Sequence, residues 1–114
     1  MESQPRELEI YRTNEGEEPF SSWLDSLKDR NARAKIKKRL DRVALGNLGN
    51  YEFVGEGVFE FKVDYGPGYR VYFAQIERRI ILLLCGGDKS TQDRDIMRAK
   101  QLWANFKQRE NVNE

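Results

Sequence analysis

The sequence predicts an α+β domain in which two N-terminal helices pack on a mostly antiparallel sheet and a C-terminal helix follows. Three observations support this class: apolar residues recur at helical spacing in the first half of the chain, alternate as in strands in the second half, and return to helical spacing near the end. The expected order is β-α-α-β-β-β-α. At 114 residues the chain has the length of one domain that buries a core without metal or disulfide support. We expect this single domain to span residues 1–114, with a frayed tail over residues 110–114.

The first elements are expected to be a short strand and a short helix. Aliphatic residues alternate within Arg6–Thr13, which predicts a strand, and the polar segment Asn14–Pro19 is typical of a loop. Apolar residues of Phe20–Leu27 are spaced for one face of a helix, and Ser21 or Ser22 is available as its cap.

A second amphipathic helix is predicted to begin at Asp29 or Asn31 and to end at Gly46. The connection that follows, Gly46–Gly57, is rich in Gly and Asn and is expected to have little regular structure. The residues predicted to form the buried stripe of this helix are Ala32, Ile36, Leu40, Val43 and Ala44.

Side-chain alternation in the next two strands predicts a polar sheet face. Lys62 lies on the opposite face of its strand from Phe61 and Val63, and Arg70 and Tyr72 alternate with apolar residues in the following strand. Pairing the two apolar faces onto the core leaves Lys62, Arg70 and Tyr72 together on the other side. We expect this open cationic and aromatic face to suit RNA.

The last strand and helix are predicted from a continuous apolar run and a cap. Ile80–Leu84 is aliphatic throughout, which indicates a strand that is covered on both faces and lies centrally in the sheet. Ser90 can cap the final helix, with Asp93 three positions later. The buried stripe of this helix is expected to consist of Ile96, Ala99, Trp103 and Phe106.

Charge is balanced overall but unevenly distributed. The net charge is +1, from 20 Lys and Arg against 19 Asp and Glu, which alone gives no nucleic-acid signal. Glutamates crowd the first 18 residues, whereas Lys and Arg crowd residues 28–42 and form a basic helix face. This face is either a solvated surface or a site for phosphate or an acidic partner, and Arg33 and Lys37 are its residues expected to contact RNA.

Cysteine usage and hydropathy favour a cytoplasmic protein. The single cysteine, Cys85, excludes a disulfide framework, favours a reducing compartment, and is expected to act as a small buried apolar residue. The longest apolar run, Ile80–Cys85, is too short for a membrane-spanning helix, which needs roughly 20 residues, and no targeting segment is visible.

The chain contains no histidine. This absence excludes a His-His ribonuclease site, a Ser-His-Asp triad, a Cys-His dyad and every metal site that needs imidazole. Asp88, Asp93 and Asp95 form the only local carboxylate cluster, and Asp93 is already assigned to a helix cap. We therefore predict neither a metal nor a cofactor.

The remaining candidates for catalytic or RNA-binding residues are cations with aromatic neighbours. Guanidinium groups bind phosphate oxygens bidentately, and tyrosine can stack on an unpaired base. Such a site can cleave RNA without metal: the 2′-hydroxyl attacks the adjacent phosphate, arginine stabilises the developing charge, and a lysine, a tyrosine or Glu60 moves the protons. The residues that could form it are Lys62, Arg70, Tyr72 and Lys89, with Arg78 and Arg79 at the next hairpin.

The chain resembles the RelE/ParE toxin superfamily in three segments. These are FEFKVDYGPGYRVYF, IILLLCGGDKSTQDRDI and the helix that ends in KQLW. The resemblance is strongest to its phage-derived, Gp49-like and HigB-like branch of addiction module killer proteins, and it covers nearly the whole chain. It implies a RelE-like microbial RNase fold. It also implies that Arg70 stabilises the scissile phosphate, that Lys89 is a second active-site cation, and that Tyr72 is a further catalytic residue.

The resemblance implies the toxin of a type II toxin-antitoxin system, which cleaves mRNA on the ribosome in the bacterial cytoplasm. Its implied partner is an antitoxin with a helix-turn-helix domain, with which such toxins form hetero-oligomers on operator DNA. Two alternatives stay open: a ParE-like protein that inhibits DNA gyrase without catalysis, and an inactive prophage remnant that only binds antitoxin. The face with Lys62, Arg70 and Tyr72 favours the nuclease, because a gyrase inhibitor needs no phosphate site.

Overall fold

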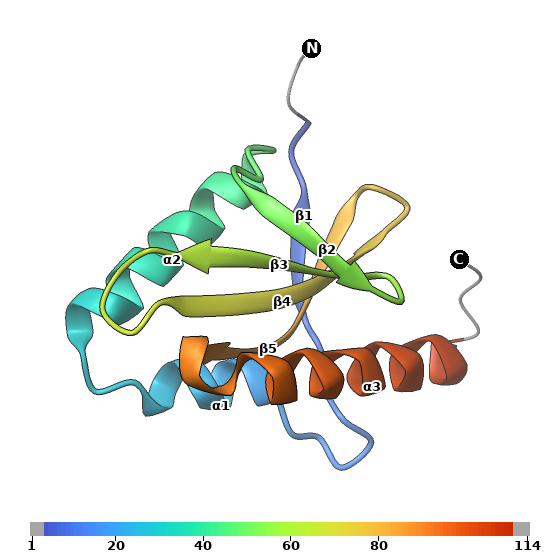
Figure 1. The fold of residues 1–114 in the computed structure, drawn as a ribbon. Helices are drawn as coiled ribbons and strands as arrows, with labels where there is room; N and C mark the ends of the chain where they lie inside the picture. Colours follow the sequence, from blue (N-terminus) through green and yellow to red (C-terminus); the bar gives the residue numbers. More distant parts are fainter. Residues whose placement is uncertain (1–3, 111–114) are drawn as a thin grey trace.

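The computed structural model describes residues 4–110 and shows a five-stranded sheet with helices on both faces (Figure 1). The strand order is β1-β5-β4-β3-β2, in which β1 and β5 are parallel and all other neighbours are antiparallel. The elements are β1 (Glu7–Ile10), α1 (Pro19–Ser26), α2 (Arg30–Ala44), β2 (Tyr51–Gly55), β3 (Val58–Val63), β4 (Tyr69–Ile76), β5 (Ile80–Asp88), the short 3₁₀ helix η1 (Lys89–Thr91) and α3 (Gln92–Glu110).

Side-chain alternation in the strands divides the core into two halves. On one face, α1 and α2 pack against apolar side chains that include Phe61 and Phe73. On the other face, α3 packs Trp103 against a cluster that includes Leu84. Most of the helical stripes predicted from the sequence are confirmed, since the buried residues include Ala32, Ile36, Leu40 and Val43 of α2 and Ala99 and Trp103 of α3, whereas Ala44, Ile96 and Phe106 are half-buried.

β5 is an interior strand, as its continuous apolar sequence predicts. It pairs with β1 on one side and β4 on the other, and helices cover both of its faces. Cys85 lies in this strand with only 1% of its surface exposed, and burial raises the pKa of its thiol to about 12. The prediction of a small buried apolar residue is confirmed.

The segment Gly46–Gly57 contains a strand that the sequence analysis missed. β2 pairs antiparallel with β3 and forms one edge of the sheet, so the observed order is β-α-α-β-β-β-β-α and the predicted order is wrong by one strand. The Gly and Asn residues that suggested a loop lie at the two ends of β2. At its exit, Gly55 and Gly57 adopt φ values of 107° and 81°, which an L-residue rarely takes.

The helix caps are partly as predicted. Asp29 begins α2, and its carboxylate accepts hydrogen bonds from the Asn31 and Ala32 backbone N–H groups at 2.9 and 3.2 Å. α1 begins one residue before the expected range, with Pro19 in its first turn, and both Ser21 and Ser22 lie inside the helix. Near α3 the capping group is Asp88, which accepts a bond of 2.8 Å from the Ser90 N–H, so the predicted role of Ser90 as the cap is wrong.

No helix within residues 4–110 has the length and apolar character needed to cross a membrane. In the same part of the chain, no three His, Cys, Asp or Glu side chains gather so that they could hold a metal ion. The carboxylates around the start of α3 instead bind neighbouring polar groups; for example, Asp95 accepts a hydrogen bond of 2.5 Å from the Thr91 hydroxyl.

Candidate functional site

Arg70 is a buried arginine held from several directions at the start of β4. Its Nη1 donates a hydrogen bond of 2.7 Å to the Gly68 carbonyl, and its Nε lies 3.7 Å from Oε2 of Glu60. Glu60 is buried too, and it accepts a hydrogen bond of 3.0 Å from the amide of Gln92, the first residue of α3. Because β3, the β3–β4 turn and α3 all contribute, the guanidinium has a fixed orientation before any ligand arrives.

The prediction that Lys62, Arg70 and Tyr72 share one face of the sheet is confirmed. Lys62 lies opposite Arg70, and Glu60 lies opposite Tyr72, so the four side chains share one face of the sheet. Lys62 is exposed to solvent, in contrast to its buried partner. This end of the face therefore combines an accessible ammonium with an oriented guanidinium.

Lys89 approaches the same place from another segment. A methyl group placed on Gly68 would lie 3.3 Å from Arg70 Nη1 and 3.8 Å from Cβ of Lys89. The glycine therefore marks the point where the β3–β4 turn meets η1, and Lys89 is exposed there. The two cations to which the resemblance assigns active-site roles are thus brought together across Gly68.

The expectation of an open sheet face is wrong for most of this surface, because α3 covers it. Tyr72 is 0% exposed and belongs to the apolar cluster beneath α3, so its ring cannot stack on an RNA base in this conformation. Within residues 4–110 its hydroxyl has no hydrogen-bond partner. Burial, reinforced by the nearby Glu60 carboxylate, raises the pKa of Tyr72 far above its ordinary value, so the hydroxyl keeps its proton and is a poor proton donor.

If the parent cleaves RNA, as the resemblance implies, we expect Tyr72→Phe to retain that activity within a few-fold. Its melting temperature should stay the same or rise, because a buried hydroxyl without a partner costs about 1–3 kcal/mol and phenylalanine lacks that group. Thermal melting and a cleavage assay on the same preparation test this. A loss of activity of a hundredfold without a change in melting would return Tyr72 to the catalytic set.

The other predicted RNA contacts lie away from Arg70. Arg78 and Arg79 follow Ile76, at the far end of β4, about 20 Å along the strand from Arg70. Arg33 donates a hydrogen bond to the Leu27 carbonyl and thus joins α2 to the end of α1. At about 100° per residue, Arg33 and Lys37 share one flank of α2.

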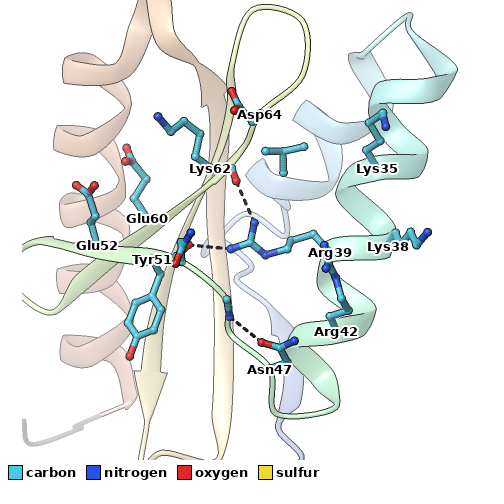
Figure 2. A pocket seen from close by; sticks show the side chains of 13 residues that line it. Lys35, Lys38, Arg39, Arg42, Asn47, Tyr51, Glu52, Glu60, Lys62 and Asp64 are labelled. Carbon is cyan, nitrogen blue, oxygen red and sulfur yellow. Dashed lines mark hydrogen bonds between the residues drawn. The ribbon is translucent and has the colours of Figure 1, made fainter.

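The opposite flank of α2 lines a groove that the sequence analysis did not identify. This groove, of about 1080 Å³, lies between α2 and the edge formed by β2 and β3. In Figure 2, Lys35, Lys38 and Arg42 stand along α2 on one side, and Tyr51 and Glu52 stand on the strand side. The i, i+3, i+7 spacing of the three cations was the available signal, because it places them on one flank. The groove is lined by Lys35, Lys38, Arg39, Arg42, Asn47, Gly49, Asn50, Tyr51, Glu52, Glu60, Lys62, Val63 and Asp64.

Comparisons with known proteins place these features in a family. The model of the phage-derived Gp49-like protein family (DUF891) matches residues 22–104. The chain belongs to the Gp49-like family. This is a toxin-like family of the RelE/HigB type. Over 83 residues the chain is also 51% identical to a protein of Haemophilus influenzae (strain ATCC 51907 / DSM 11121 / KW20 / Rd) that carries the name "Uncharacterized protein"; this covers 73% of the chain and 84% of the relative. The Gp49-like match includes Arg70, Lys89 and the whole groove.

Proposed function

We propose that this member of the Gp49-like family is the HigB-like toxin of a type II toxin-antitoxin system and a metal-independent endoribonuclease that cleaves mRNA on the ribosome. The observation that carries the proposal is the oriented guanidinium of Arg70 beside the exposed Lys89. A preorganised donor of this kind stabilises charge that develops on a phosphate. The RelE-like microbial RNase fold is part of the same proposal.

The proposed reaction uses the 2′-hydroxyl of RNA as the nucleophile. Its oxygen bonds to the adjacent phosphorus while the bond to the 5′-oxygen breaks, which leaves a 2′,3′-cyclic phosphate and a 5′-hydroxyl. Arg70 binds the non-bridging phosphate oxygens, and Lys89 adds a second positive charge at the same phosphate. The nucleophile loses a proton and the leaving oxygen gains one, so the reaction needs no oxidant and no net proton.

The proposed partner is an antitoxin with a helix-turn-helix domain, and the complex is proposed to bind operator DNA. The basic face of α2 supports an acidic binding segment on that partner, since charge complementarity accelerates association and selects partners. Such a segment would neutralise the toxin by covering cations that RNA otherwise contacts.

The chemical ends of the RNA fragments test the proposed reaction. We expect 2′,3′-cyclic or 3′-phosphate ends and 5′-hydroxyl ends after brief induction of the toxin, mapped by primer extension and end-specific ligation. The ends are a better measure than chelation, because ribosomes themselves need magnesium. Fragments with 5′-phosphate and 3′-hydroxyl ends would contradict the mechanism, since metal-assisted attack by water produces them. Growth arrest with intact mRNA would instead favour the gyrase inhibitor.

A further inference from the structure

We infer that the groove between α2 and the β2–β3 edge binds single-stranded RNA, with phosphates along the helix wall and bases along the strand wall. The inference rests on the proposed function, because it names the path by which that substrate reaches Arg70. At about 1080 Å³ the groove lies at the upper end of the roughly 300–1,000 Å³ of small-molecule pockets, so its size alone does not identify the ligand. Its cations from Lys35 to Arg42 are spread over about 10 Å of α2, which suits a chain with repeated phosphates.

The helix wall offers cations that are accessible to phosphate. Lys35, Lys38 and Arg42 are exposed, and no ion pair within the described residues 4–110 engages them. Arg39, which lies among them, has a different role. Its guanidinium donates to the carbonyls of Lys62 and Asn50 at 3.0 and 2.8 Å, which joins α2 to the strand wall. Arg39 thus fixes the spacing of the two walls. Lys35 Nζ lies 5.2 Å from the centroid of the Tyr65 ring, so Lys38 and Arg42 are the cations most available to a ligand.

The strand wall offers groups that suit bases. The Tyr51 ring is 42% exposed, and the rings of Phe59 and Phe73 pack against it with centroids at 5.8 and 6.2 Å. A supported ring with one accessible side is a platform for stacking a base. Glu52 and Asp64 also line the strand side of the groove, Glu52 from the face of β2 opposite to that of Tyr51, and carboxylates accept hydrogen bonds from the exocyclic amino groups of bases.

The distribution of charge favours RNA over an acidic peptide. A single strand of RNA carries its anionic phosphates along one side and its bases, which bear hydrogen-bond donors, along the other. The groove matches this asymmetry, with cations along α2 and an aromatic ring and carboxylates along the strand edge. An acidic peptide projects carboxylates in several directions, and those that face Glu52 and Asp64 would be repelled.

The groove also leads to the proposed active site. Lys62 and Glu60 line its strand wall, and the same Glu60 carboxylate lies 3.7 Å from Arg70 Nε. A strand that follows the groove past Lys62 therefore arrives beside Arg70. This continuity makes the groove an extension of the substrate site and not an isolated basic patch.

The test measures binding of a 2′-O-methyl oligonucleotide of about ten nucleotides, which cannot be cleaved through its 2′-oxygen. The variant Lys38→Gln/Arg42→Gln removes two charges from the groove, and the control Lys28→Gln/Arg30→Gln removes two exposed charges at the N-terminal end of the same helix, outside the groove. We expect the groove variant to flatten the plot of log K against log salt by about 1.4, since each phosphate contact on a single strand contributes about 0.7. The control should keep the parent slope.

A second pair of variants tests the stacking platform. Tyr51→Ala should weaken binding by roughly five- to hundredfold, the range for loss of one stacked base, whereas Tyr51→Phe should bind like the parent. All four variants should melt within a few degrees of the parent, since Tyr51 and the four substituted cations are exposed.

Several results would overturn the groove assignment. The parent could fail to bind the oligonucleotide, the groove variant could keep the parent slope, or the control could flatten the slope as much as the groove variant does. A polyglutamate peptide serves as a further probe: loss of its binding in the groove variant, with RNA binding retained, would identify an acidic protein segment as the occupant. Cleavage of mRNA is measured separately, so a parent that binds RNA through the groove yet leaves mRNA intact would reject the nuclease and keep the groove.

Discussion

Arg70→Ala is expected to lower the rate of the proposed mRNA cleavage by about 10²–10³, because it removes the donor that we propose for the phosphate. The same substitution should cost stability. Glu60 would be left buried without its cationic partner, and broken buried pairs cost about 3–5 kcal/mol. We expect about 3 kcal/mol, at the low end of that range, because Gln92 still donates a hydrogen bond to Glu60. Denaturant unfolding and a cleavage assay measure the two effects.

A second variant separates catalysis from stability. In Arg70→Ala/Glu60→Gln the buried carboxylate is neutral, so most of the lost stability should return while the activity stays well below that of Glu60→Gln alone. Arg70→Lys should give an intermediate rate, because lysine retains the charge but not the planar fork that binds two phosphate oxygens. If the stable double variant cleaves mRNA at the parent rate, Arg70 serves only to hold the fold together.

The position of Arg70 in the sheet could be predicted from the sequence, but its burial could not be read from its own strand. Alternation in β3 and β4 was enough to place Lys62, Arg70 and Tyr72 on one face of the sheet, because strand parity depends only on local sequence. Burial depends on what covers the face. The apolar run Ile80–Leu84 already required cover on both sides of the sheet, and that requirement conflicts with an open face beside it.

The groove and β2 escaped prediction for different reasons. The glycines around Tyr51–Gly55 are turn residues in the structure, and they outweighed the short alternating strand between them. The groove forms between segments that are distant in the sequence. Its two walls come from α2 and from strands that follow a separate turn, and the hydrogen bonds of Arg39 that join them link residues up to 23 positions apart. Local patterns contain no information on such contacts, although the spacing of the cations on α2 does show which flank they share.

Trp103→Ala is expected to destabilise the protein by about 3–5 kcal/mol, the range for truncating a buried tryptophan. Trp103 is 1% exposed in α3, stacks on Phe106 with ring centroids 5.6 Å apart, and lies so close over Gly57 that a methyl group there would approach its Nε1 to 2.5 Å. Because Trp103 is packed so tightly, its truncation to alanine leaves a cavity that the neighbouring backbone cannot easily fill. Since native domains are stable by only about 5–15 kcal/mol, a loss of this size removes much of the total.

The matched control for this prediction is Met97→Ala, which truncates a large side chain on the same helix at a position that is 64% exposed. It should change the free energy of unfolding by no more than about 0.5 kcal/mol, as is usual for surface sites. Because α3 also supplies Gln92 to the Arg70–Glu60 pair, Trp103→Ala should lose activity in proportion to the folded fraction, and lower temperature should restore both. Arg70→Ala/Glu60→Gln should instead stay inactive when fully folded. Equal unfolding free energies for Trp103→Ala and the parent would mean that α3 does not close the second half of the core.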